Sequence, residues 1–306
     1  MCGIARNWRR CALSDPFLLD KRLVRRAFDR AAESYDAAAA LQHEVAQRML
    51  ERLSLFRQTP RIVLDAGSGT GRAAASLSRH FPRASILELD LAPAMLRKSR
   101  ERGPRWMRYL PMANRRLHVC ADNERMPLRD QSIDLLWSNL SFQWSTDLER
   151  VLREAKRVLR PEGLLMFSTF GPDTLRELRE AFAVADAGIH VNRFVDMHDI
   201  GDMLVGCGFA DPVMDMENFT LTYDSVRDLM RELKMIGAHN VNQGRRKSLS
   251  GPKAWNDALT RYERLRNAQH RLPATFEVVY GHAWVPARRT GPGGRAVIDL
   301  KIAPHA

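Results

Sequence analysis

Short apolar runs alternate with amphipathic stretches through the middle of the chain, between about residues 60 and 170. The apolar runs are typical of buried strands, and the stretches between them space their apolar residues three or four positions apart, as helices do. The predicted strands are 62–66, 84–89, 117–121, 133–138 and 164–169. The predicted helices are 72–80, a helix beginning at Pro93, and 146–159, with a stop at 160–163. This alternation predicts an α/β fold whose parallel sheet is covered on both faces.

The flanking segments have a different pattern. Amphipathic spacing predicts two N-terminal helices, 23–33 and 38–56, separated by a break at Tyr35-Asp36. Beyond the core, the pattern predicts helices over 172–205 (with a break at 190–194), 225–236 and 252–269, and strands over 212–223 and 274–284. We therefore divide the chain into a disordered leader (1–20), a helical cap (21–58), a core (59–170), substrate-covering helices with the last strands (171–286) and a basic tail (287–306).

Composition adds limits on the class of protein. The chain has 306 residues, of which 45% are hydrophobic and 27% charged, as in soluble globular proteins. It has no apolar run of about 18 residues, so we expect no membrane span. The cysteine usage fits a reducing compartment, and we expect a cytoplasmic location. The basic, acid-poor leader resembles a transit peptide, but we favour a disordered segment. The four cysteines form no CxxC pair or histidine-interleaved cluster, so we expect no metal site and no disulfide framework.

The net charge of +12 is concentrated in two blocks. Residues 97–116 carry eight basic residues and one acidic residue, and residues 240–306 carry twelve basic and four acidic residues. We expect 97–116 to be a loop or frayed helix. Basic blocks favour an acidic macromolecular partner, although charge that only aids solubility remains an alternative. Nucleic acid is the first candidate from charge alone, but neither block interleaves aromatic residues with its charges, and an acidic protein fits equally well.

The segment DAGSGTG, residues 65–71, carries the clearest chemical signal. A strand that ends in an acid and alternate glycines allows close approach of a ligand to the backbone at a helix N-terminus. Asp90 lies 19 residues beyond Gly71, where a carboxylate can accept hydrogen bonds from both hydroxyl groups of a ribose. The dinucleotide pattern G-x-G-x-x-G would need glycine at position 72, where this chain has Arg72. A cofactor of the mononucleoside type is therefore favoured.

Other polar residues follow the next predicted strands. In an open α/β sheet, ligands bind outside the carboxyl ends of the strands. Asp122 could accept a hydrogen bond from an adenine amino group, and Asn139 lies at the end of the fourth strand. A helix cap or a turn residue is the alternative interpretation of each acid taken alone.

Together these residues resemble the class I S-adenosylmethionine-dependent methyltransferases. Residues 65–71 match the first motif of that family, Asp90 the second, and 121–123 (ADN) the adenine-contacting one. The resemblance implies S-adenosyl-L-methionine as the cofactor and a Rossmann-like seven-stranded sheet whose last strand, here 274–284, is antiparallel. The cofactor-binding residues that it implies are Asp65, Gly67, Ser68, Gly69, Gly71, Asp90, Leu91, Asp122, Asn123 and Asn139.

A narrower resemblance, to the malonyl-acyl-carrier-protein O-methyltransferases of biotin synthesis, runs from about residue 23 to residue 284. It rests on dispersed segments, namely 138–144 (SNLSFQW), 167–172 (FSTFGP), 190–194 (HVNRF), 233–238 (LKMIGA) and 280–284 (YGHAW). It implies methyl transfer to the free carboxylate of a malonyl thioester on an acidic acyl carrier protein. Such a carboxylate is already ionised at neutral pH, so no general base is needed.

A carboxylate acceptor calls for a cationic group, and an arginine fork fits best. Arg193 is our first candidate, with Lys234 and Arg245 as weaker candidates, and His190 lies beside Arg193 in sequence. Tyr35 and Trp144 could form walls at the methionine end of the cofactor. A surface salt bridge for Arg193, polar packing for His190 and a core role for Trp144 are the structural alternatives.

Three other functions remain open at this point. The mitochondrial arginine hydroxylase and complex I assembly factor resembles this chain over a similar length, but it differs around residues 236–240 and 280–284. A small-molecule carboxyl methyltransferase and a non-catalytic, cofactor-binding assembly protein are the others. Whether the thioester is carried on a protein or on coenzyme A is not decided by the residues.

Overall fold

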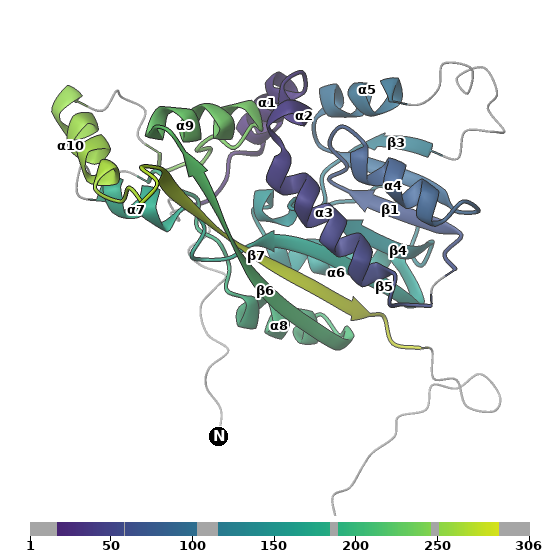
Figure 1. Cartoon of the computed structure of the whole chain (residues 1–306). Coiled ribbons are helices and arrows are strands. Elements are labelled where there is room, and N and C mark those ends of the chain that lie inside the picture. The colour runs from purple at the N-terminus through teal and green to yellow at the C-terminus, as the bar shows by residue number, and fades with distance from the viewer. Residues whose placement is uncertain (1–16, 58, 103–115, 184–188, 246–250, 288–306) are drawn as a thin grey trace, which may run out of the picture.

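A computed structural model describes residues 17–57, 59–102, 116–183, 189–245 and 251–287 (Figure 1). Most of the predicted leader (residues 1–16), most of the first basic block and most of the basic tail lie outside these residues. The strands are β1 Ile62–Ala66, β2 Ser85–Asp90, β3 Arg116–Cys120, β4 Ile133–Ser138, β5 Leu159–Phe170, β6 Ala210–Tyr223 and β7 Leu272–Trp284. The helices are α1 Lys21–Ala31, α2 Tyr35–Ala38, α3 Ala40–Leu53, α4 Arg72–His80, α5 Pro93–Glu101, α6 Leu148–Val158, α7 Arg176–Ala183, α8 Met197–Gly206, α9 Val226–Met235 and α10 Pro252–Glu263, with the 3₁₀ turn η2 Phe142–Trp144.

The strands form one seven-stranded sheet in the order β3-β2-β1-β4-β5-β7-β6. Strands β1 to β5 pair in parallel, and β7 is antiparallel to both of its neighbours, β5 and β6. Seven strands with an antiparallel last strand are what the sequence predicted, and the predicted fold class is confirmed. The chain moves outward in opposite directions from β1, toward β3 on one side and toward β4 on the other. A ligand site is expected at that switch point, outside the carboxyl ends of β1 and β4.

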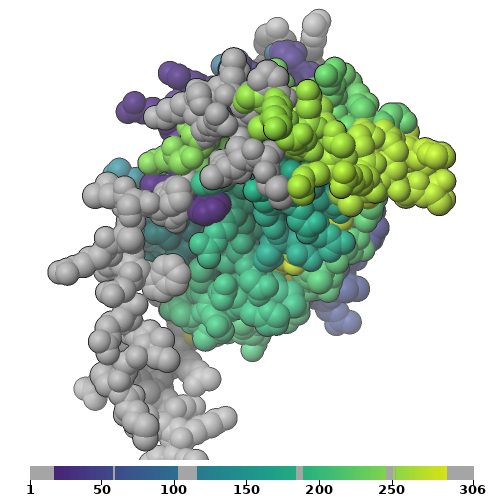
Figure 2. Space-filling view, turned by 90° about the vertical axis from the view of Figure 1, so that its left-hand side faces the viewer, coloured from purple at the N-terminus to yellow at the C-terminus, as the bar shows by residue number. Residues whose placement is uncertain are grey.

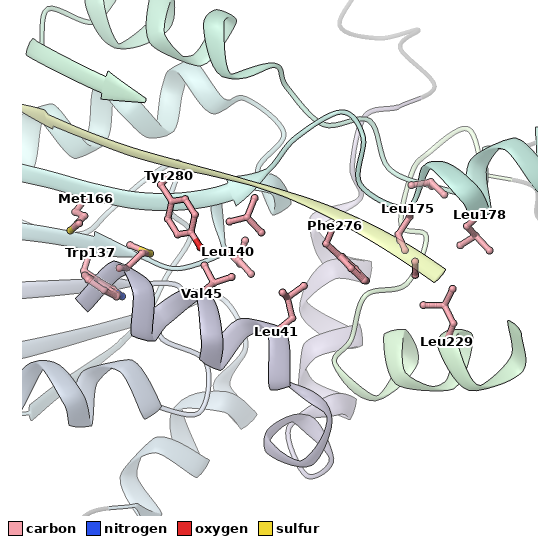
Figure 3. Close-up of a cluster of buried hydrophobic side chains, with 14 of the residues drawn as sticks. Leu41, Val45, Trp137, Leu140, Met166, Leu175, Leu178, Leu229, Phe276 and Tyr280 are labelled. Carbon is pink, nitrogen blue, oxygen red and sulfur yellow. The ribbon is translucent and has the colours of Figure 1, made fainter. Parts of the chain in front are cut away.

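Apolar side chains alternate along the strands and build a core on each face of the sheet. Val63 and Trp137 pack on the face covered by α3 and α4, whereas Leu64 and Leu136 pack on the face covered by α6 and α8. Figure 3 shows how α3 lies along the first of these faces, with Trp137 among its contacts. The open sheet is therefore covered by helices on both faces, as the alternating pattern predicted.

Helices α7, α9 and α10 gather beyond the sheet, near the start of β7 (Figure 1). Their buried faces extend the first core through Leu178, Leu229 and Tyr262 to Phe276 of β7. Figure 2 shows α10, in yellow-green, protruding from the body of the molecule. None of the helices in the described ranges is long and apolar enough to span a bilayer.

Three of the differences from the sequence prediction have a physical cause in the structure. The predicted stop at 160–163 lies inside β5, which begins at Leu159 because Ile133 pairs with that residue and Glu162 N donates to Val285 O at 2.8 Å. The break predicted at Tyr35-Asp36 is instead the short helix α2. Helix α10 ends at Glu263, not at 269, because the next residues form a turn in which Asn267 N donates to Arg271 O at 2.9 Å.

Candidate active site

A cavity lies at the carboxyl ends of β1, β2 and β4, under helices α1 and α2. It occupies the switch point of the sheet. Its lining residues are Lys21, Val24, Phe28, Tyr35, Gly67, Gly69, Asp90, Leu91, Met95, Ala121, Asp122, Asn123, Asn139, Leu140, Ser141, Trp144 and Ser145. The structure therefore brings together nine of the predicted site residues, from both sides of the switch point.

The glycine turn forms the floor of the cavity. Gly67 N and Ser68 N both donate to Leu89 O, at 2.7 and 3.0 Å, which fastens the turn to the end of β2. Gly67, Gly69 and Gly71 all have positive φ, at 80°, 54° and 75°, where a side chain would be strained. A Cβ on Gly69 would meet no atom within 4 Å, so this part of the turn faces open space.

Asp90 holds the turn and faces the cavity at the same time. Its Oδ2 accepts from Gly69 N at 2.8 Å, and its Oδ1 accepts from Ala92 N at 2.7 Å. Each oxygen keeps a second lone pair, so the carboxylate can still accept from two hydroxyl groups. Burial raises the pKa of Asp90 to about 6, although both backbone N–H groups favour its ionised form.

Helix α2 brings Tyr35 over the cavity because its neighbour, Asp36, is tied to the glycine turn. Thr70 Oγ1 donates to Asp36 Oδ1 at 2.6 Å, and Arg102 pairs with Asp36 while its Nε donates to Thr70 O at 2.9 Å. Burial, followed by the charges of Asp90 and Asp36, raises the pKa of Tyr35. The phenol therefore stays protonated at neutral pH and acts as a wall and potential donor, not as a base.

Helix α1 forms the roof. Lys21 Nζ lies 2.9 Å from Asp122 Oδ1 and 2.8 Å from Glu124 Oε1, which ties the start of the helix to the loop after β3. About two turns further along, the Phe28 and Trp144 rings form a T-shaped pair with centroids 5.2 Å apart. The predicted wall residue Trp144 is therefore in the cavity, where it closes the roof against η2.

Two amides complete the walls in different ways. Asn123 Nδ2 donates to Ser141 Oγ at 3.1 Å, while its Oδ1 is buried and has no hydrogen-bond partner among the described residues. Asn139 uses its side chain for structure, since Nδ2 donates to Gln42 O at 2.9 Å and Oδ1 accepts from Ser168 Oγ at 2.9 Å. Asn123 therefore offers a free acceptor to a ligand, and Asn139 positions the end of β4 between α3 and β5.

Three predicted cofactor residues lie behind the wall. Ser68 is buried within the turn, and Asp65 is buried at the end of β1, where desolvation and then Glu88 raise its pKa well above the usual range. Gly71 caps α4, and a Cβ there would overlap the Ser99 hydroxyl and lie 2.7 Å from Glu88 Oε2. These residues shape the turn and do not line the cavity.

The residues predicted to bind the acceptor also do not line the cavity. Arg193 and Lys234 are exposed, and the His190 ring packs on Phe182 with centroids 4.6 Å apart. Arg245 Nη1 donates to the backbone carbonyl of Asn242 at 3.0 Å. The segments that carry Arg193 and Arg245 are nevertheless joined through Asn242.

Asn242 is fully buried and links three parts of the chain. Its Nδ2 donates to Asn192 Oδ1 and to Asn240 Oδ1, both at 2.9 Å, and it forms an isolated bridge with Leu19, just before α1. The segment that carries His190 and Arg193 is thereby attached to the roof of the cavity. Since this link spans about 50 residues in one direction and more than 200 in the other, no local pattern predicts it.

Comparison with known proteins decides the family. A model described as a methyltransferase domain matches residues 64–167. A malonyl-[acyl-carrier protein] O-methyltransferase from Gallionella capsiferriformans is 54% identical over 94% of this chain and 98% of its own length. Another, from Laribacter hongkongensis, is 53% identical over 96% and 99%. The chain belongs to the malonyl-[acyl-carrier protein] O-methyltransferase family.

Solved structures share the fold of this family member at low identity. The YcgJ protein of Bacillus subtilis superimposes with a TM-score of 0.55 over 80% of this chain and 99% of its own, at 15% identity. A phosphoethanolamine N-methyltransferase of Haemonchus contortus, in complex with S-adenosyl-L-methionine, gives 0.53 over 84% and 57%, at 18% identity. These similarities support the sheet and its helical layers, and no more.

The sequence did not single out the roof of this methyltransferase. Lys21, Val24 and Phe28 line the cavity, and so do Ser141 and Ser145 around η2. The amphipathic pattern predicted a cap helix, and spacing of three or four residues places Lys21, Val24 and Phe28 on one face. What the pattern lacks is the target of that face, because the partners Asp122 and Trp144 lie more than 100 residues away.

Proposed function

We propose that this chain transfers a methyl group from S-adenosyl-L-methionine to the free carboxylate of malonyl-acyl carrier protein, an early step of biotin synthesis. The observation that supports this most strongly is the extent of the identity to relatives of that name. It covers 94% of this chain and 98% of one relative, and so includes the helical segments that surround the acceptor side. A likeness limited to the methyltransferase domain, residues 64–167, would support only the methyl donor.

The cavity has the chemistry that this cofactor requires. Asp90 would accept hydrogen bonds from the two ribose hydroxyl groups. Asn123 Oδ1, with Asp122 beside it, would accept a hydrogen bond from the adenine amino group. The open space at Gly69 would admit the methionine part close to the backbone. Leu91 and Met95 would pack against the apolar faces of the nucleoside.

When bound, the cofactor would supply a sulfonium methyl group to which a carboxylate oxygen can bond while the S–CH3 bond breaks and the neutral thioether leaves, with no proton transfer. The acceptor carboxyl is ionised well below neutral pH, so the protein must align it and exclude water. Alignment of this kind is worth roughly 7–11 kcal/mol in the best cases. Tyr35 and Trp144 would fill this role as walls of the reacting end, since the phenol is protonated and the indole is not basic.

We place the binding site for the malonyl carboxylate at the segment around Arg193. The Arg193 guanidinium would bind the carboxylate through two parallel hydrogen bonds, with His190 beside it and Lys234 or Arg245 as further cations. Asn242 supports this because it attaches that segment to the roof of the cavity. Fixing the fork relative to the cofactor is what alignment for in-line attack needs.

Mass spectrometry tests the proposal directly. Malonyl-acyl carrier protein is incubated with the purified protein and S-adenosyl-L-methionine, and we expect a mass gain of one methyl group. Acetyl-acyl carrier protein, which lacks the free carboxylate, serves as the matched control and is expected to gain nothing. If the cofactor bound but malonyl-acyl carrier protein stayed unmodified, an assembly or small-molecule function would replace this proposal.

A further inference from the structure

Helix α1 has two faces with different chemistry. The inner face places Val24 and Phe28 on the cavity wall. The outer face carries Arg22, Arg26 and Arg30, spaced four residues apart on successive turns, and all three are exposed. The helix that covers the cofactor cavity thus presents a row of guanidinium groups to solvent.

Helix α9 repeats this arrangement. Its inner face buries Val226 and Leu229 in the core, and its outer face exposes Arg227, Arg231 and Lys234. The spacing of four and then three residues again places the three cations on one side of the helix. Two neighbouring amphipathic helices therefore both have a basic outer face.

The two helices meet beside the cavity. Ser34 Oγ, just after α1, donates to Met235 O at the end of α9 at 2.9 Å. Gly237 packs on the Phe28 ring, since a Cβ there would lie 3.1 Å from Phe28 Cδ1, and the same ring lines the cavity. Figure 1 shows α1, α2 and α9 together at one end of the molecule. The two basic rows thus come together at the helix ends that carry Arg30 and Lys234, one side-chain layer from the cofactor site.

Most of this charge is not neutralised within the described part of the chain. Of the six cations, only Arg231 forms an ion pair with a described residue, Asp228. The arginines of α3 behave differently, because Arg48 pairs with Glu44 and Glu217 and Arg52 pairs with Asp215. A surface that keeps its cations unpaired is suited to an anionic partner.

The effect of these cations on a nearby histidine agrees with one continuous positive surface. The pKa of His239, which lies in the loop after α9, is lowered first by burial and then by the charges of Arg30 and Lys234. Cations from both helices therefore act on the same point, and the histidine is neutral at physiological pH. The rows form one positive region, and not two separate ones.

We propose that the outer faces of α1 and α9 form the docking surface for an acidic face of the carrier protein that delivers the malonyl group. This inference rests on the proposed function. A carrier protein must bind close to the entrance so that its acyl arm can reach the cofactor, and this surface adjoins the cavity. A nucleic acid fits less well, because neither outer face exposes an aromatic side chain for stacking.

Charge reversal on each helix tests the surface. The variant Arg26→Glu/Arg227→Glu is compared with Arg79→Glu/Arg129→Glu, which reverses the same charge at exposed sites on α4 and in the loop before β4. We expect the first variant to raise KM for malonyl-acyl carrier protein about tenfold, with kcat unchanged, because reversed rim charges act mainly on association. Its Kd for S-adenosyl-L-methionine and its turnover of malonyl-coenzyme A should stay within about twofold of wild type, since neither needs this surface. The control variant should match wild type in all assays.

The outcomes separate the two proposals. A wild-type protein that leaves malonyl-acyl carrier protein unmodified would reject the proposed function. Normal wild-type turnover with an unchanged KM in the Arg26→Glu/Arg227→Glu variant would reject the docking surface alone. Tighter binding of a single-stranded RNA than of the carrier protein, lost in the same variant, would assign the surface to nucleic acid and also overturn the inference.

Discussion

Gly69 and Gly71 lie two residues apart in the same turn, yet replacing each with alanine should affect different properties of the protein. Both have positive φ, so both substitutions carry the strain of the left-handed conformation, roughly 1–2 kcal/mol. They differ in what the new methyl group meets. At Gly69 it meets no atom within 4 Å, and at Gly71 it meets the buried group formed by Ser99, Arg116 and Glu88.

The structure sets the size of the difference. Glu88 is fully buried and lies 2.6 Å from Arg116, and breaking such a buried pair costs about 3–5 kcal/mol. We therefore expect Gly71→Ala to lower the free energy of unfolding by about 4–7 kcal/mol, and Gly69→Ala by only about 1–2 kcal/mol. Gly69→Ala instead places a methyl group where the cofactor would lie, and it should weaken binding of S-adenosyl-L-methionine at least about tenfold, or about 1.4 kcal/mol.

Two measurements on purified protein separate these effects. Urea denaturation without cofactor reports stability, and isothermal titration calorimetry reports Kd for S-adenosyl-L-methionine. Equal loss of stability in the two variants would refute the assignment of Gly71 to packing. A Gly69→Ala protein with a wild-type Kd would refute the position given to the cofactor.

The other predictions concern a titration, the acceptor and a buried amide. Because the pKa of Asp90 is raised to about 6, its carboxylate becomes protonated below that pH, and Kd for S-adenosyl-L-methionine should rise about tenfold per pH unit there. Calorimetry on Asp90→Asn should give a weak Kd that varies little over the same range. Arg193→Ala should lower turnover of malonyl-acyl carrier protein more than about tenfold while Kd for the cofactor stays constant, and a turnover within about twofold of wild type would contradict the fork. Asn242→Ala removes both amide donations and should cost about 1–3 kcal/mol in urea denaturation.

Elements whose signal is local could be predicted from sequence. The bounds of β1 and α4 agree with the prediction, because a β-branched run, three glycines and an amphipathic helix follow one another within 20 residues. The same holds for β4. The floor of the site follows from these elements, since parallel strands bring their carboxyl ends to one edge.

Elements whose ends depend on distant partners could not be placed in this way. Strand β5 starts at Leu159 because β4 and the residue after β7 pair with its first residues, although Pro161-Glu162-Gly163 has the composition of a turn. The position of the roof of the cavity also depends on residues that are distant in the sequence. An amphipathic pattern shows that Val24 and Phe28 are on the buried face of α1, but only the ion pairs of Lys21 and the ring of Trp144 determine what they cover.

The described contacts around the cavity fix positions, and the proposed reaction requires positioning and not a base. Burial holds Tyr35 protonated, and burial with neighbouring cations holds His239 neutral and poorly basic. The proposed acceptor is already an anion, so a proton acceptor would add nothing. Rate must then come from how rigidly the two reacting groups are held. Asp36 ties one wall to the glycine turn, and Asn242 ties the acceptor segment to the roof. Substitutions at these two supports should therefore lower kcat even though neither residue lines the cavity.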